Sequence, residues 1–199
     1  MIMTEEELLT FLEKEYSEVY VKAESLPKPY IGKQEIKAIL LGTDPTNPSN
    51  EIFEYVFGLE KSNSSYIGFL ESNLKVLYNL GLHNLYIQNL CKNYFTKVTS
   101  ENKSWREIAK HWAPLIKEEF DNKFEKNVPV LISAERILDV VLIGSEKKQK
   151  ADYYYSSACF IDEGINIFDR VLIPFYRHRD YELSKWDDYK NKIDSIFLD

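Results

Sequence analysis

The sequence predicts a single α/β domain over residues 1–199, a three-layer sandwich with a central parallel sheet of about four strands between helices. Short apolar runs, each ending abruptly at glycine or polar residues, alternate with longer segments of helical periodicity. Parallel neighbours need such a crossover between them, so this alternation favours a parallel sheet. The chain has 199 residues, 44% of them hydrophobic, which is enough for one sizeable core. We find no repeat and no linker long enough to divide it.

The first element expected is an amphipathic helix over Thr4–Val21, which with its lead-in occupies residues 1–30. Thr4 fits an N-cap, and Glu7 three residues later completes a capping-box pattern. The buried stripe of this helix would consist of Leu8, Leu9, Leu12 and Tyr16. The proline-containing segment 25–29 then ends the helix.

Four short apolar runs are expected to form the sheet. They cover Ile36–Leu41, Leu85–Ile87, Val128–Ser133 and Val171–Pro174. The first run stops at Gly42 and is followed by a loop, Thr43–Asn50, whose prolines and asparagines suit turns.

Helical patterns separate and follow these runs. We expect helices over Phe69–Leu80, from Ser104 to about Phe120, over Glu135–Ile143 and over Ser184–Phe197. Gly81 would end the first of them, Glu107 would complete a capping box with Ser104, and Pro114 would kink the second. The polar, tyrosine-rich segment 147–157 is expected to be a surface loop.

Composition narrows the classes of function. The formal net charge of −7 argues against a tight non-specific nucleic-acid binder, although segments 147–150 and 170–179 are locally basic. Two widely spaced cysteines cannot form a disulfide framework. Together with three scattered histidines, they also give no spacing typical of a metal centre. We therefore expect a cytoplasmic monomer that needs no cofactor or metal. The sequence has no apolar run long enough to predict a membrane span. Its first residues are acidic rather than basic, which argues against a secretory signal.

Polar side chains follow each of the four expected strands. They are Asp44, Asn89, Ser133 with Glu135, and Arg177 with His178. The carboxyl ends of parallel strands share one edge, where open α/β sheets bind their ligands. Four separated segments are therefore expected to converge on one site.

Asp44 is the central candidate, because a carboxylate between a buried strand and Pro45 is rigidly placed. Such a group can orient a water or stabilise a developing positive charge. The alternative is an ordinary turn-forming Asp-Pro pair. Asn89 offers one acceptor and two donors, which suits the edge of a pyrimidine, and the alternative is an amide that caps local backbone.

The remaining candidates have equally open alternatives. Phe57 follows the Asp44 loop and would stack on a flat ligand unless it is simply a core residue. His178 lies between two arginines, which disfavour the imidazolium and favour a neutral hydrogen-bond donor; a surface basic cluster is the alternative. Lys92 would touch phosphate or be solvated.

These segments together resemble the uracil-DNA glycosylase superfamily. The resemblance rests on residues 39–45, on Phe57 fifteen residues after Gly42, and on residues 85–90. It implies a four-stranded parallel sheet flanked by helices, and hydrolysis of the N-glycosidic bond of uracil or a related damaged base flipped out of DNA. DNA repair by base excision, with DNA as partner, would follow.

The resemblance also implies roles for individual residues. Asp44 corresponds to the acid that positions water and supports the oxocarbenium-like sugar, and His178 to the imidazole that stabilises the leaving base. Base-binding groups would be Phe57 by stacking, Asn89 by hydrogen bonding, and Gly42 and Thr43 as backbone. Members commonly carry His-Pro-Ser after the last strand; this chain has Arg177-His178-Arg179, so Arg177 joins Lys92 as a candidate phosphate or base contact.

Two further departures shape the functional hypotheses. Thr46 stands where a tyrosine often excludes thymine, and two cysteines are too few for the iron–sulfur branch. The leading hypothesis is a DNA glycosylase. The alternatives are a non-catalytic base-, nucleotide- or nucleic-acid-binding protein of the same fold, and an unrelated nucleoside-processing protein in which Asp44 binds a ribose.

Overall fold

The computed structural model describes residues 3–45, 51–60, 65–144, 153, 160–175, 191, 194 and 197. Several sequence predictions fall outside these ranges. They concern Thr46, the loop over 147–157 apart from Tyr153, the segment containing Arg177 and His178, and most of the closing helix expected over 184–197.

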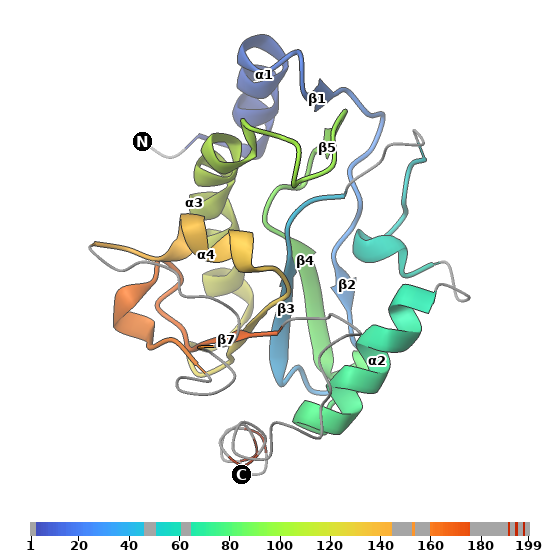
Figure 1. Cartoon of the computed structure of the whole chain (residues 1–199), viewed down its shortest axis with the longest axis vertical. Coiled ribbons are helices and arrows are strands. Elements are labelled where there is room, and N and C mark those ends of the chain that lie inside the picture. The colour runs from blue at the N-terminus through green and yellow to red at the C-terminus, as the bar shows by residue number, and fades with distance from the viewer. Residues whose placement is uncertain are drawn as a thin grey trace.

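The centre of the molecule is a mostly parallel sheet, as predicted (Figure 1). Its strand order is β2-β4-β3-β6-β7. The four parallel strands are β3 (Ala38–Gly42), β4 (Leu85–Asn89), β6 (Val130–Ile132) and β7 (Leu172–Pro174). Strand β2 (Tyr30–Ile31), which the sequence analysis missed, pairs antiparallel with β4 at the edge.

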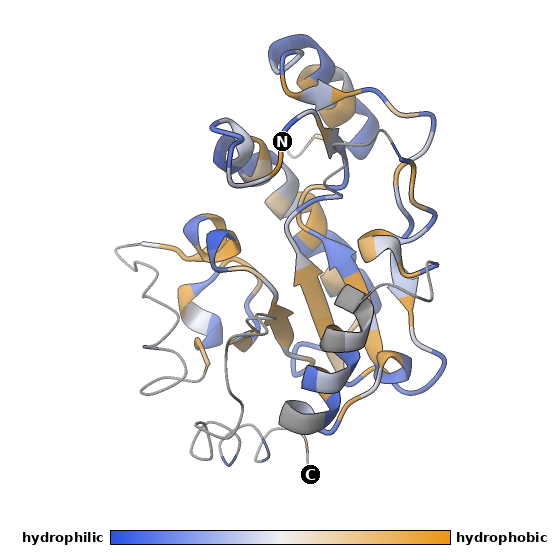
Figure 2. Ribbon diagram, turned by 45° about the vertical axis from the view of Figure 1, so that its right-hand side comes forward, coloured by the Kyte–Doolittle hydropathy of each residue, from blue (hydrophilic) through white to orange (hydrophobic). Residues whose placement is uncertain are grey.

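The strands form where the chain is apolar enough to be covered on both faces. Every residue of β3 and β4 is buried, so these strands read as continuous apolar runs rather than alternating ones. Figure 2 shows the hydrophobic residues concentrated on the central strands and the hydrophilic ones on the outer helices.

Helix α1 (Glu5–Glu15) begins as predicted and ends earlier than predicted. Its capping box is present, with the Glu7 backbone N–H donating to Thr4 Oγ1 at 3.2 Å and the Thr4 N–H donating to Glu7 Oε2 at 2.8 Å. The extension to Val21 is wrong, because Tyr20–Val21 forms strand β1 and pairs with β5 (Tyr94–Phe95).

Helices α2 (Ser65–Tyr78) and α3 (Trp105–Lys123) lie on opposite faces of the sheet (Figure 1). Helix α2 is followed by Asn79, whose φ of 51° is the left-handed conformation that asparagine tolerates. Gly81 is extended with φ −113°, so its predicted role as the helix stop is wrong.

The N-terminus of α3 also differs from expectation. The Ser104 side chain makes no capping hydrogen bond, so the predicted capping box with Glu107 does not form. Instead, Asn102 Oδ1 accepts a hydrogen bond from the Ser104 backbone N–H at 3.0 Å. Pro114 lies inside the helix, and α4 (Glu135–Val141) follows β6 as predicted.

The carboxyl end of α3 is held by Arg170, whose side chain is fully buried. Its guanidinium donates to the carbonyl oxygens of Phe120 at 3.1 Å and Phe124 at 2.7 Å. Phe124 is the C-cap of α3, and its carbonyl is one of those that a helix end leaves without an intrahelical donor. The Phe120 carbonyl also accepts the Phe124 backbone N–H at 3.0 Å. Arg170 therefore fixes α3 against the β6–β7 half of the sheet. No helix in the described ranges is long and apolar enough to cross a membrane.

Candidate functional site

The carboxyl ends of the parallel strands form one row of residues. Gly42 lies opposite Asn89 in the β3–β4 pairing. The Ser133 backbone N–H donates to Leu41 O at 3.0 Å, and the Phe175 N–H donates to Ile132 O at 2.7 Å, so the ladder continues one residue beyond β6 and β7. Neighbouring positions across the sheet are therefore Asn89, Gly42, Ser133 and Phe175. Of the polar residues expected at the strand ends, Asn89 and Ser133 lie in this row, on either side of Gly42.

Side-chain contacts show which face of the sheet this row occupies. Gln88 reaches α3, where its Nε2 lies 3.0 Å from Glu119 Oε1. Phe175 reaches α2, where its ring centroid lies 5.3 Å from that of Tyr78. Side chains alternate along a strand, and register neighbours share a face. Asn89, Ser133 and the α-carbon of Gly42 therefore face the α2 side, away from α3.

Gly42 is the point on which two candidate residues converge. A β-carbon at this position would lie 2.3 Å from Asn89 Oδ1 and 2.6 Å from Phe57 Cζ. Both distances are too short for any side chain, so the amide and the ring occupy the space that a larger residue would fill. Asn89 was expected at a strand end and Phe57 was selected through the family resemblance, and the structure brings both to the same α-carbon.

Phe57 reaches this position with an unusual backbone. It lies in a short 3-10 segment, η1 (Val56–Gly58), with φ 63°, and Gly58 has the same φ. A bulky residue in the left-handed region costs about 1–3 kcal/mol and persists only where surrounding structure enforces it. This strained backbone conformation places the Phe57 ring over Gly42.

Asp44 is buried beyond the end of β3, with 8% of its surface exposed. Its Oδ1 accepts a hydrogen bond of 2.6 Å from the Thr99 hydroxyl. The Thr43 hydroxyl lies 3.4 Å from the same Thr99 oxygen. A carboxylate held in this way has a fixed orientation, which a turn residue facing solvent would lack.

Thr99 belongs to a loop that Arg136 of α4 anchors. The Arg136 guanidinium donates to the carbonyl oxygens of Thr99 and of Asn102, the second at 3.0 Å. It also lies over the Trp105 ring, 5.3 Å from the centroid. Sequence reasoning missed both Thr99 and Arg136, because the contacts join segments 55 and 37 residues apart.

One polar side chain in the strand-end row is buried without a partner in the described part of the chain. Ser133 is 3% exposed, and its hydroxyl makes no hydrogen bond there. Asn89 is also 3% exposed, and its backbone N–H donates to Gln88 Oε1. Leaving a buried polar group unpaired costs about 1–3 kcal/mol, so such groups call for an explanation.

Lys92 does not extend toward this row. Its ammonium forms ion pairs with Glu119 at 2.7 Å and Glu5 at 2.8 Å, which also accepts its hydrogen bond. Burial alone would lower the Lys92 pKa, but the two carboxylates raise it above its usual value. The ammonium is therefore committed to α1 and α3, and we leave Lys92 out of the candidate site.

Glu119 is the hub of a buried polar network on the α3 face. Besides Lys92 it accepts hydrogen bonds from the Tyr86 hydroxyl and from Gln88 Nε2. Burial raises the Glu119 pKa, but the Lys92 charge and these hydrogen bonds outweigh it and lower the pKa below its usual value. Gln88 Oε1 in turn accepts the Asn89 backbone N–H at 2.9 Å.

Cys91 lies behind the row and is fully buried. Its backbone N–H donates to Thr43 O at 2.9 Å, which continues the β3–β4 pairing past the strand ends. Burial and the negative charge of Asp44 raise the pKa of the Cys91 thiol well above its usual value. The thiol is therefore neutral near pH 7 and unsuited to act as a nucleophile.

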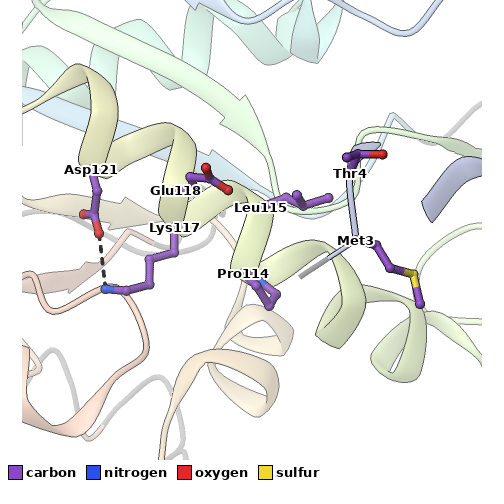
Figure 3. A pocket seen from close by; sticks show the side chains of 7 residues that line it. All are labelled: Met3, Thr4, Pro114, Leu115, Lys117, Glu118 and Asp121. Carbon is purple, nitrogen blue, oxygen red and sulfur yellow. Dashed lines mark ion pairs between the residues drawn. The ribbon is translucent and has the colours of Figure 1, made fainter. Parts of the chain in front are cut away.

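A groove elsewhere on the molecule shares no residue with the row (Figure 3). It has a volume of about 570 Å³ and lies between the start of α1 and α3. Met3, Thr4, Pro114, Leu115, Lys117, Glu118 and Asp121 line it. Lys117 is paired with Asp121 at 3.4 Å and with Asp169 at 2.6 Å, so the groove offers no uncommitted cation. Among the described residues, no three His, Cys, Asp or Glu side chains are grouped to hold a metal ion.

The chain matches no protein-family model, and comparison with curated proteins gives no match either. The case for any function therefore rests on the row of strand-end residues and the loop that holds Asp44.

Proposed function

We propose that this chain is a DNA glycosylase-like protein of the uracil-DNA glycosylase superfamily. It would hydrolyse the N-glycosidic bond of uracil, or of a related damaged base, flipped out of DNA. The observation that carries the proposal is the approach of the Asn89 amide and the Phe57 ring to one α-carbon, that of Gly42, two residues before Asp44. An amide beside a ring suits a flat, polar-edged ligand.

Asp44 supplies the chemistry in this proposal. As the glycosidic bond breaks, positive charge develops on the sugar and a water must attack it. A carboxylate fixed at that point stabilises the charge and orients the water. The hydrogen bond from Thr99 supports this role, since it fixes one carboxylate oxygen while Arg136 anchors the Thr99 loop.

The base is held by the other groups. Phe57 stacks on its face, and Asn89 hydrogen-bonds its edge with an amide that no described residue engages. Gly42 leaves room for both. Stabilisation of the departing base falls to His178 or Arg177 in this proposal; both lie outside the described residues.

A second candidate, a non-catalytic protein that binds a base or nucleotide, is favoured by charge. The net charge is −7, and two basic side chains near the strand ends are already engaged. Lys92 pairs with Glu5 and Glu119, and Arg136 bonds two carbonyl oxygens. Neither is therefore available to hold DNA phosphates.

The test is release of base from uracil-containing single- and double-stranded oligonucleotides. The parent should release base, Asp44→Asn should lower the rate by about 10²–10⁴-fold, as loss of a general base does, and Asn89→Ala should raise KM. Gly42→Ala should abolish release, because its methyl group would collide with Asn89 and Phe57. Gly68→Ala is the matched control, since a β-carbon there meets nothing within 4 Å.

The outcomes separate the two candidates. If a folded parent releases no base from uracil-containing or mismatched substrates, the enzyme proposal fails. If that parent still binds uracil or uridine, and Asp44→Asn binds as well, the binding protein is supported. Binding that does not weaken with salt argues against phosphate contacts.

A further inference from the structure

We propose that Tyr94 is a positioning residue for the ring that stacks on the base. Its hydroxyl holds the start of the segment 53–60, and this segment carries the Phe57 ring to Gly42. Loss of the hydroxyl should therefore weaken base binding and leave the chemistry at Asp44 intact. The inference rests on the proposed function, because it takes Phe57 to stack on a base.

The first argument is the hydrogen bond that joins Tyr94 to this segment. Tyr94 lies on β5 and is buried, and its hydroxyl accepts the Phe53 backbone N–H at 2.8 Å. The donor and the acceptor are 41 residues apart in the sequence. A backbone N–H that loses its acceptor inside the fold is left unsatisfied at a cost. Without the hydroxyl, conformations in which Phe53 leaves this place are therefore favoured.

The second argument is the contact between Phe53 and the strained pair Phe57–Gly58. A β-carbon added at Gly58 would lie 3.3 Å from two atoms of the Phe53 ring, so this ring packs against the Gly58 α-carbon. Phe57 and Gly58 both have φ 63°. A bulky residue keeps such a conformation only where the surrounding structure enforces it, and the Phe53 ring is part of that structure. A chain of contacts therefore runs from the Tyr94 hydroxyl to the Phe57 ring.

The middle of the segment is fixed by contacts of a different kind. The backbone N–H groups of Glu54 and Tyr55 donate to the Glu60 carboxylate at 3.3 and 3.2 Å. The Lys28 backbone N–H donates to Glu54 O at 2.8 Å. Glu60 is exposed and belongs to the segment itself, and Lys28 acts through its backbone. Tyr94 differs from both, because it is a buried side chain that reaches the segment from another strand.

These contacts predict an effect on binding rather than on the bound complex. When a ring is in its binding position in only a fraction of the molecules, the apparent affinity for the ligand falls by that fraction. One ordinary hydrogen bond corresponds to a factor of about five. Once a base is bound the ring is in place, so the rate at saturating substrate depends on Asp44 and is preserved.

The experiment compares the parent with Tyr94→Phe, which keeps the ring and removes only the hydroxyl. With a uracil-containing oligonucleotide, KM should rise about fivefold and kcat should stay within about twofold. The dissociation constant of free uracil, measured by calorimetry, should rise by the same factor as KM. Tyr20→Phe is the matched control and should change none of these values. Tyr20 lies on β1, which pairs with β5, and the described residues give its hydroxyl no hydrogen bond.

A double-mutant cycle with Phe57→Ala separates positioning of the ring from a general loss of stability. In the Phe57→Ala background, Tyr94→Phe should cause no further loss of uracil affinity, because the hydroxyl acts through the ring. An equal loss in both backgrounds, unchanged affinity in either single variant, or a fall in kcat as large as the rise in KM would overturn the inference. Base release by the parent would then leave the proposed function standing. A folded parent that neither releases nor binds uracil removes both.

Discussion

The two faces of the sheet at the end of β4 treat buried polar groups in opposite ways. On the α3 face, Gln88 uses both ends of its amide, with Glu119 and with the Asn89 backbone N–H, and Glu119 is further bonded to Tyr86 and Lys92. On the α2 face, the Ser133 hydroxyl is buried without a partner among the described residues, and the Asn89 amide lies over Gly42 beside the Phe57 ring. Polar burial on the first face is satisfied within the fold, whereas on the second face it leaves the Ser133 hydroxyl without a partner among the described residues.

The largest expected effect comes from removing the hub of the satisfied face. Glu119→Ala would leave the Lys92 ammonium, the Tyr86 hydroxyl and Gln88 without their shared acceptor. Breaking a buried pair by removing one partner costs about 3–5 kcal/mol. Urea unfolding should show this loss, whereas Glu118→Ala, at an exposed position of the same helix, should change stability by less than about 0.5 kcal/mol. Equal losses would remove the distinction between the two faces.

Gly42→Ala should have the next largest effect, now on the open face. The added methyl group lies 2.3 Å from Asn89 Oδ1 and 2.6 Å from Phe57 Cζ, so one of them must move. Overpacking of this kind costs about 1–3 kcal/mol. In the same unfolding assay, Gly68→Ala should be neutral or stabilising, because alanine is the better residue inside a helix. A neutral Gly42→Ala would mean that Phe57 swings away at no cost.

Acid should weaken the satisfied face selectively. The pKa of Glu119 is lower in the folded than in the unfolded chain, so the Glu119 carboxylate adds to the free energy of unfolding. This addition is present above the unfolded pKa of about 4.3 and is lost as pH falls through the folded pKa. The raised pKa of Lys92 adds a contribution that is lost only as pH rises above about 10.4. Between pH 7 and pH 3, Glu119→Gln should therefore lose less stability than the parent. Parallel pH profiles would contradict this.

The smallest effect is expected for Asn89→Ala, at below about 1 kcal/mol, because no hydrogen bond to a described residue is lost. Its neighbour provides the comparison: Gln88→Ala should cost about 1–3 kcal/mol, since it leaves the Asn89 N–H and one Glu119 contact unsatisfied. Thermal unfolding of the two variants side by side measures the difference. If Asn89→Ala is the more destabilising of the two, its amide serves the fold.

Local patterns predicted much of the framework. The apolar runs ending at Gly42 and Asn89 became β3 and β4 with boundaries within two residues, and Thr4 with Glu7 formed the predicted capping box. The two-residue strands escaped notice because pairings such as Tyr30 with Ile87 carry no signal within either segment. The prediction that Gly81 ends the helix was wrong because Asn79, two residues earlier, adopts the left-handed conformation.

The candidate site was predictable to a lesser depth. Residues at strand ends could be placed in one row from the order of elements, and Asn89, Gly42 and Ser133 do share it. The local sequence does not show which polar side chains are already paired within the fold. Lys92 forms ion pairs with Glu5 and Glu119, and Thr99 donates a hydrogen bond to Asp44; both contacts join residues far apart in the chain.

Cys91 gives this region a built-in chemical reporter. A thiol-modifying reagent reacts with the thiolate of an accessible cysteine, and Cys91 is fully enclosed, neutral, and tied through its backbone to Thr43. Once Cys159 is replaced, the rate at which the remaining thiol is labelled reports how often the ends of β3 and β4 separate. If a base binds beside Phe57 and Asn89 as proposed, it should slow the labelling of Cys91, so binding can be followed without knowing the reaction.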